Sequence, residues 1–217
     1  MSIVPDTHLT ATLTSTREPA VQTPTPTSTP TIDLFTIEDF LDPRMREEVL
    51  AELRAAASAP STTLSGGVHS AVRRSTRVEV PEATREWVRQ RLMEHKGALE
   101  AHFGVALSEC EAPQFLRYRE GDFFVPHQDG NTPLVYDDSR FRRVSVVVFV
   151  TPRSEEPAPG AYGGGELVFH GHYATAPTLR VVAPARPGEL VAFRSETTHE
   201  VTPVTHGERF TIVTWFR

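Results

Sequence analysis

The sequence predicts a mostly β protein with helices near its N-terminus, an α+β fold in which a sandwich or barrel follows a short helical region. Between residues 32 and 110, apolar residues recur at helical spacing. After Pro113 the pattern changes to short apolar runs separated by Gly and Pro, which is typical of such β architectures. The apolar run from Val144 to Val150 is long enough for a strand buried on both faces.

The first 31 residues have the composition of a disordered tail. Thr, Pro and Ser predominate in them, and apolar side chains are too sparse to offset the entropy of ordering the chain. We therefore predict a Thr/Pro-rich tail over 1–31, a helical brace and loop over 32–110, and a β domain over 111–217. Residues 32–217 would form one globular unit. The tail is either dispensable or a docking or localisation segment.

Two helices are expected before the β domain. Asp42 can cap the first helix and Pro43 fits its first turn, and Ala59-Pro60 would end it. The second would start at Pro81 and pack through an apolar stripe of Val88, Leu92, Leu99 and Phe103. Residues 61–77 between them are predicted to form a loop that leads into a short strand. If this loop covers a site, His69, Arg73 or Arg74 could contact substrate.

Five strands are expected in the β domain. Each is short, rich in β-branched or aromatic residues and bounded by turn residues. They cover Val144–Val150, Leu167–Phe169, Arg180–Val182, Leu190–Phe193 and Phe210–Phe216.

Composition and charge argue against several partners. The net charge of −6 disfavours a nucleic-acid backbone. No apolar run approaches the roughly 20 residues of a membrane span, and the N-terminus lacks the features of a secretory signal. Cys110 is the only cysteine, so an internal disulfide is impossible. We expect a cytoplasmic protein.

A metal site is predicted from His127, Asp129 and His199. His127 and Asp129 are two residues apart, so in extended backbone their side chains point to one side. A third ligand must come from elsewhere, and His199 is the best candidate. Two imidazoles and one carboxylate leave open positions and suit Fe(II) that activates dioxygen. The alternative is that each histidine is an ordinary packed or surface residue.

The order of several motifs resembles the Fe(II)/2-oxoglutarate-dependent dioxygenases, and within them the prolyl 4-hydroxylase-like group. The resemblance covers residues 111–217. It is carried by Tyr118-x-x-Gly121 before His127-x-Asp129, the run 143–150, Gly164-Gly165-Glu166-Leu167, the run 187–193, and His199 to Val204 followed by Arg209. It implies a double-stranded β-helix, that is, a jelly-roll barrel braced by the two helices.

The resemblance also implies the reaction and its cofactors. The enzyme would use Fe(II), 2-oxoglutarate and O2, with ascorbate as a reductant, and would hydroxylate an unactivated C–H bond while forming succinate and CO2. Arg209 would bind the distal carboxylate of 2-oxoglutarate, and Thr211 and Tyr118 could add contacts. The alternative for Arg209 is a surface pair with Glu208. The substrate, a prolyl residue in a peptide or a proline-like small molecule, stays open.

Two further histidines, His170 and His172, could belong to a different metal-binding motif. Gly164, His170 and His172 fit the opening of a cupin metal motif, but the carboxylate expected a few residues later is absent. We interpret His170 and His172 as residues near the mouth of the barrel that could touch substrate. The rival function is a non-enzymatic, cupin-like module that binds a metal or ligand.

Overall fold

The computed structural model describes residues 31–61, 70–130 and 137–217. Within these ranges the helices are α1 (Pro43–Ala55), α2 (Glu82–Glu94) and α3 (Lys96–Phe103), and a 3-10 turn covers Asp138–Phe141. The first strands are β1 (Leu34–Ile37), β2 (Ser58–Pro60), β3 (Arg73–Arg74), β4 (Thr76–Val78), β5 (Gln114–Tyr118) and β6 (Phe123–His127). The later strands are β7 (Val144–Phe149), β8 (Gly163–Gly164), β9 (Leu167–His170), β10 (Arg180–Val182), β11 (Leu190–Arg194), β12 (His199–Val201), β13 (Val204–His206) and β14 (Arg209–Phe216). The protein is mostly β, as predicted.

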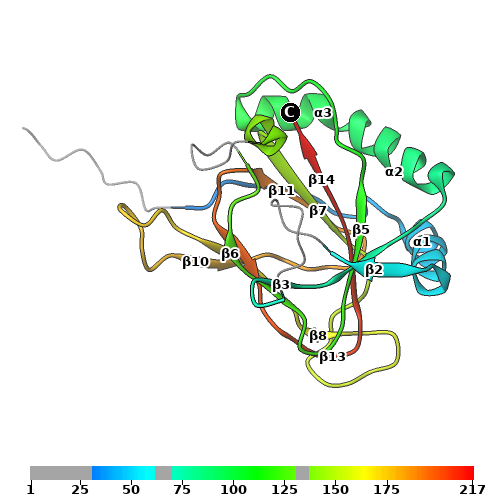
Figure 1. Cartoon of the computed structure of the whole chain (residues 1–217). Helices are drawn as coiled ribbons and strands as arrows, with labels where there is room; N and C mark the ends of the chain where they lie inside the picture. The colour runs from blue at the N-terminus through cyan, green and yellow to red at the C-terminus, as the bar shows by residue number, and fades with distance from the viewer. Residues whose placement is uncertain (1–30, 62–69, 131–136) are drawn as a thin grey trace, which may run out of the picture.

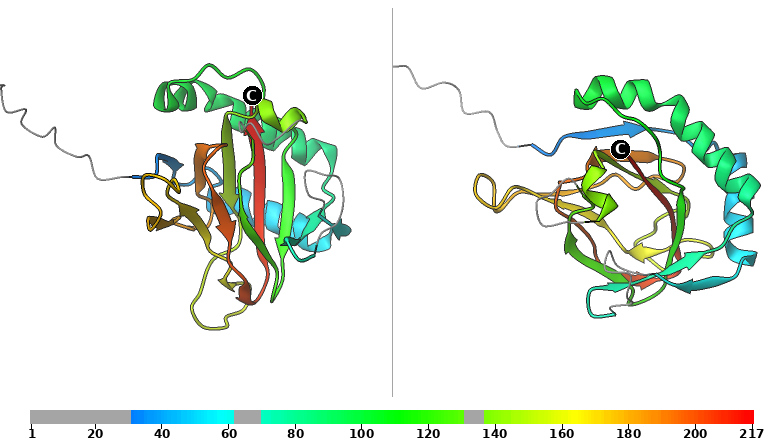
Figure 2. Two further views of the ribbon diagram at one scale, coloured as in Figure 1. Left: turned by 60° about the vertical axis from the view of Figure 1, so that its left-hand side comes forward. Right: turned by 45° about the horizontal axis from the view of Figure 1, so that its top comes forward.

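The strands form a larger and a smaller antiparallel sheet (Figures 1 and 2). The larger has the order β1-β11-β7-β14-β5-β4-β2 and the smaller β10-β9-β12-β6-β3, with β13 and β8 as a separate pair. The five strands predicted from the sequence are present, with ends that differ by no more than one residue. The segment 32–110 does more than brace the fold, because it also supplies β1, β2 and β4 to the larger sheet.

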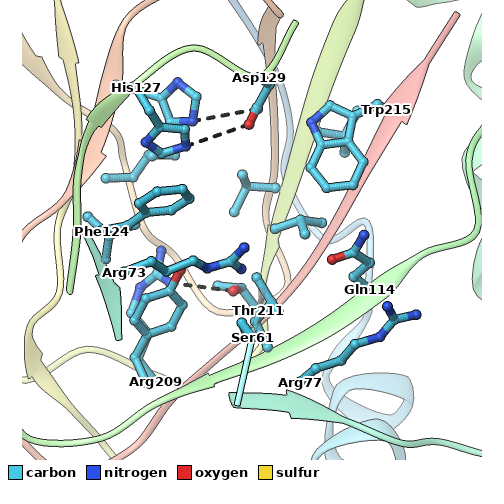
Figure 3. Close-up of a pocket in the computed structure, with 18 of the residues that line it drawn as sticks. Ser61, Arg73, Arg77, Gln114, Phe124, His127, Asp129, Arg209, Thr211 and Trp215 are labelled. Atoms are coloured by element: carbon cyan, nitrogen blue, oxygen red, sulfur yellow. Dashed lines mark hydrogen bonds and ion pairs between the residues drawn. The ribbon is translucent and has the colours of Figure 1, made fainter. Parts of the chain in front are cut away.

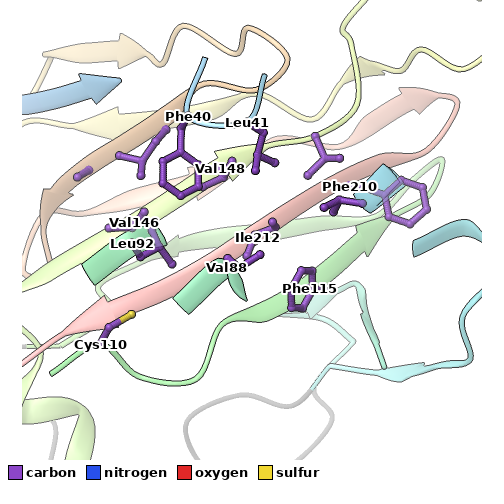
Figure 4. Packing of buried hydrophobic residues seen from close by; sticks show 14 of the residues in the cluster. Phe40, Leu41, Val88, Leu92, Cys110, Phe115, Val146, Val148, Phe210 and Ile212 are labelled. Carbon is purple, nitrogen blue, oxygen red and sulfur yellow. The ribbon is translucent and has the colours of Figure 1, made fainter. Parts of the chain in front are cut away.

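The main apolar core lies between the helices and the outer face of the larger sheet (Figures 2 and 4). Alternate residues of β7 and β14, among them Val146, Val148, Phe210 and Ile212, pack against Val88 and other apolar residues of the helices. The residues between them in sequence face the smaller sheet. Strand β7 is buried at every position because both of its faces are covered, as the continuous apolar run predicted.

Two details of the predicted helices are wrong. Asp42 does cap α1, with its side chain accepting from the Met45 N–H at 2.9 Å, but the helix ends at Ala55 instead of Ala59-Pro60. Residues 58–60 form β2 because they pair with β4. The second predicted helix is divided at His95, whose N–H donates to the Leu92 carbonyl at 3.1 Å in a tighter turn. Helix α3 begins at the next residue, Lys96.

The tail predicted over residues 1–31 lies outside the described residues except for its last position. His69, in the loop considered as a cover for the site, also lies outside them. In the described part of the chain, no helix is both long and apolar enough to cross a bilayer.

Candidate active site

Strands β6 and β12 bring the two predicted histidine ligands together. His127 at the end of β6 is the direct antiparallel partner of His199 at the start of β12. Asp129 follows β6, and its N–H donates to the Ser195 carbonyl at 2.9 Å. One ligand atom from each of the three side chains lies within 4.8 Å of the other two. Within the described residues this is the one group of three such side chains that could hold a metal ion.

The hydrogen bonds of the two imidazoles fix which ring nitrogen is available. His127 Nδ1 lies 2.8 Å from the Val125 carbonyl, and His199 Nδ1 lies 2.9 Å from the Thr197 carbonyl. A carbonyl only accepts, so each Nδ1 carries the proton and each Nε2 keeps its lone pair. The two Nε2 atoms point toward Asp129, each 3.6 Å from a carboxylate oxygen (Figure 3). The protein thus sets both rings in the state that metal ligation requires.

The charge states of the triad also suit a cation. Burial, together with repulsion from His127, lowers the pKa of His199 to about 4, so this imidazole is neutral at neutral pH. Burial alone raises the pKa of Asp129, but its interactions with the two imidazoles and with Trp215 outweigh burial and hold that pKa well below its usual range. Asp129 therefore stays ionised. The site thus presents the negative charge of Asp129 and the neutral imidazole of His199.

Aromatic and charged neighbours hold the ligands in place. The Phe124 ring stacks on His127 with 3.5 Å between ring centroids. A register irregularity between β6 and β12 allows Phe124 and His127, three residues apart, to line the same cavity. The Trp215 indole N–H lies toward the Asp129 carboxylate (Figure 3) and helps to lower its pKa. The sequence pattern could have indicated Trp215, since it shares the alternation of Arg209 and Thr211 on β14.

A partly buried ion pair supports Trp215 and the Asp129 backbone. Arg142 binds Glu111 through two hydrogen bonds of 2.9 and 2.8 Å. Its guanidinium lies 3.6 Å from the Trp215 ring centroid, and Nη1 donates to the Asp129 carbonyl at 3.2 Å. Arg217 adds a hydrogen bond to Glu111 at 3.0 Å. This network ties the C-terminus and the start of β5 to the segment that carries Asp129.

A cavity of about 580 Å³ opens beside the triad, and Arg209 lies at its other end (Figure 3). Arg209 is 1% exposed, and its guanidinium lies 5.2 Å from the Tyr118 ring and 5.4 Å from the Phe149 ring. Its Nε has no hydrogen-bond partner in the part of the chain that the structure describes. No carboxylate of the described residues forms an ion pair with it, because Glu208 pairs with Arg117 and Arg119 instead. The alternative of an Arg209–Glu208 surface pair is therefore wrong.

Tyr118 and Thr211 line the same cavity as Arg209. Tyr118 is the direct partner of Arg209 between β5 and β14. Thr211 is two residues along β14, and its hydroxyl accepts from Arg209 Nη1 at 3.4 Å. All three side chains are at most 2% exposed. The three residues predicted to bind one carboxylate thus gather at one end of the cavity.

His170 and His172 do not line this cavity. His170 Nε2 lies 3.2 Å from a Glu200 carboxylate oxygen, and the ring of His172 contacts Tyr173.

Of the loop residues considered as substrate contacts, Arg73 lines the cavity and Arg74 does not. The structure adds Arg77, Glu79 and Gln114 to the lining, which the sequence alone did not indicate.

Two imidazoles and one carboxylate beside a cavity in a mostly β fold are typical of non-haem Fe(II) oxygenases. Residues 113–217 match the family model of the 2OG-Fe(II) oxygenase superfamily. A PKHD-type hydroxylase of Paracoccus denitrificans is 31% identical over 185 residues, which cover 84% of this chain and 77% of the relative. A PKHD-type hydroxylase of Hyphomonas neptunium is 30% identical over 193 residues, which cover 85% of this chain and 78% of the relative. The chain belongs to the 2OG-Fe(II) oxygenase superfamily, whose enzymes use Fe(II), 2-oxoglutarate and O2.

Solved structures show the same fold. A Pseudomonas putida prolyl-4-hydroxylase matches with a TM-score of 0.65 and 22% identity, over 86% of this chain and 93% of that chain. A Trichoplax adhaerens prolyl hydroxylase was solved with a peptide fragment of hypoxia inducible factor. It matches with the same TM-score of 0.65 at 17% identity, over 86% of this chain and 84% of that chain.

The residues present fit both cofactors of the superfamily. The two Nε2 lone pairs and the Asp129 carboxylate form a donor set that suits Fe(II). At the other end of the cavity, the buried Arg209 has no protein carboxylate as partner among the described residues. A buried cation without a counter-ion is expensive, and an anionic ligand at this position would compensate it.

Proposed function

We propose that His127, Asp129 and His199 hold Fe(II), and that Arg209 binds the distal carboxylate of 2-oxoglutarate with help from Thr211 and Tyr118. The protein would then hydroxylate an unactivated C–H bond of a prolyl or proline-like substrate, with succinate and CO2 as the other products. The observation that carries the proposal is the single cavity with the three donors at one end and the unpaired Arg209 at the other.

Iron, when bound, supplies the chemistry that reduces dioxygen and oxidises the substrate C–H bond. The side chains bind, orient and exclude water. The guanidinium of Arg209 can hold a carboxylate through two parallel hydrogen bonds, which fixes orientation as well as distance. The apolar lining from Val147, Leu167 and Val213 keeps the space between the two ends poor in water.

The choice of a prolyl or proline-like substrate rests on similarity. Both solved structures named above are prolyl hydroxylases, and one of them holds a peptide. A peptide therefore fits as a substrate, as does a proline-like small molecule. We further propose that residues 32–217 form one unit in which 111–217 is the oxygenase domain, that the two sheets close into a double-stranded β-helix, and that the enzyme works in the cytoplasm with ascorbate as a reductant.

An anaerobic titration of the Fe(II)-loaded protein with 2-oxoglutarate tests the proposal. We expect a visible metal-to-ligand charge-transfer band that saturates at one equivalent of 2-oxoglutarate per iron. Succinate formed after oxygen is admitted would establish turnover. Iron that is bound without any such band would contradict the oxygenase proposal and favour a cupin-like metal or ligand binder.

A further inference from the structure

The larger sheet carries a polar surface into the cavity on the side away from Arg209. Leu116 on β5 pairs with Thr211 on β14 and with Arg77 on β4, so these three residues form one row across the sheet. Side chains in one row lie on one face of a sheet. All three line the cavity, and so do Gln114, two residues before Leu116 on β5, and Glu79, two residues after Arg77 and just beyond the end of β4. Figure 3 shows Arg77 and Gln114 together on one side of the cavity.

The arginines that line the cavity differ in how fully their charges are compensated. Arg142 is held by Glu111 in a bidentate pair, and Arg209 faces the proposed 2-oxoglutarate position. For Arg77 the nearest carboxylate among the described residues is that of Glu79 at 3.8 Å, too long for a hydrogen bond. Glu79 is also shared with Arg85 at 3.6 Å. Arg85 also contacts Glu82 at 3.7 Å, so it does not depend on Glu79 alone. Among the described residues, the Arg77 guanidinium has only the contact with Glu79 at 3.8 Å, so its N–H donors remain available to a ligand.

Neutral hydrogen-bonding groups accompany this charge. The Gln114 amide, which offers donors and an acceptor, lies on the strand next to Arg77 and Glu79. Ser61 is in the lining and is 6% exposed, and its hydroxyl has no hydrogen-bond partner among the described residues. On the opposite side, Arg73 lies 4.8 Å over the Phe124 ring. A buried hydroxyl without a partner among the described residues, and a guanidinium that makes no hydrogen bond to them, line the same cavity and indicate a polar ligand.

We propose that the part of the cavity formed by Arg77, Glu79 and Gln114 binds the primary substrate through a carboxylate, with Arg77 as its main partner. This inference rests on the proposed function and adds the chemical class of the substrate. The carboxylate is either the α-carboxylate of a proline-like small molecule or an acidic group of a peptide beside the reacting residue. Arg77 is a specificity-determining residue in this assignment.

The test uses matched probes that differ only in the carboxylate. They are L-proline against L-prolinamide, and acetyl-Pro-Glu-amide against acetyl-Pro-Gln-amide. Binding to the Mn(II)-loaded protein with 2-oxoglutarate is measured by paramagnetic broadening of the probe proton resonances, which reports proximity to the metal. We expect the carboxylate member of one pair to bind more tightly than its amide. The first pair would identify an α-carboxylate, and the second an acidic peptide.

Variants assign the effect to the proposed residues. Arg77→Gln should weaken binding of the preferred probe about 3- to 10-fold, a modest effect because the side chain is partly exposed and screened. Glu79→Gln should strengthen it about 2-fold, since a competing anion is removed. Arg119→Gln makes the same charge change outside the cavity and should change nothing.

Equal binding of carboxylate and amide in both pairs, no binding of any probe, or an Arg77→Gln affinity equal to wild type would each overturn the inference. The charge-transfer band distinguishes a failure of this substrate assignment from a failure of the proposed function. If the band forms normally in wild type and Arg77→Gln while the carboxylate preference is absent, only the substrate assignment fails.

Discussion

Arg209 and Arg77 lie on the same inner face of the same sheet, yet their surroundings differ. Arg209 is 1% exposed, and its guanidinium lies 5.2 Å from the Tyr118 ring and 5.4 Å from the Phe149 ring. The Arg77 side chain is 40% exposed, and its nearest carboxylate is 3.8 Å away. The same residue type therefore occupies a closed, dry end of the cavity and an open, wet side.

The difference indicates two kinds of recognition. At the closed end, low polarity strengthens electrostatic interactions, and the packed rings hold the guanidinium in one orientation, which suits a single invariant ligand. At the open side, water screens the charge and the side chain can move, which suits a variable substrate. Changes at the buried triad and Arg209 should therefore have much larger effects than changes at Arg77.

The largest effect is expected for Asp129→Ala. The variant removes the only charged donor of the triad, so the purified protein should bind no stoichiometric Fe(II) in an equilibrium titration. His170→Ala is the matched control, because His170 pairs with Glu200 outside the cavity, and it should bind iron like wild type. Iron that remains in Asp129→Ala but is lost in His170→Ala would show that the triad is misassigned.

Arg209→Met tests the closed end directly. It leaves the distal carboxylate of 2-oxoglutarate in a buried position without a charged partner. We expect its apparent Kd, from the charge-transfer titration, to rise by about 100-fold or more. Arg77→Met should change the same Kd by less than about 3-fold. Equal effects of the two substitutions would break the distinction between the closed end and the open side.

The buried triad should also make the metal-free protein sensitive to acid. The pKa of His199 is about 4 in the folded state against 6.5 in the reference state, so the unfolded chain binds more protons between these values. The free energy of unfolding should therefore be highest above pH 6.5, where His199 is neutral in both states. It should fall by about 1–3 kcal/mol as the pH drops toward 4. Urea unfolding at pH 7 and pH 5 measures this. His199→Gln should reduce the difference, and an unchanged difference would contradict the prediction.

A smaller effect is expected for Trp215→Phe. The substitution keeps the apolar ring but removes the N–H that lies toward Asp129. Groups that orient metal ligands typically contribute about 10-fold or more to affinity, so Fe(II) binding should weaken by about 10-fold. Trp87→Phe is the control, since Trp87 packs against the core near the helices and should leave iron affinity unchanged. Equal affinities for wild type and Trp215→Phe would assign the indole a packing role alone.

Local sequence patterns determined much of this site. Period-two alternation placed Arg209 and Thr211 on one side of β14, and both line the cavity. The spacing of His127 and Asp129 likewise predicted that they would converge, as they do. The pair Asp42-Pro43 predicted the start of α1. Each prediction succeeded because it depends on the backbone geometry of a few consecutive residues.

Only the tertiary structure decided how distant strands align. His127 meets His199 because β6 and β12 pair in one particular register. Arg77 enters the cavity because β4 extends the larger sheet next to β5, although its segment had been predicted as part of a loop that leads into a short strand. The C-terminal end of α1 depends in the same way on strand pairing, because residues 58–60 pair with β4. Register and strand order arise from contacts between segments far apart in sequence, so no local pattern contains them.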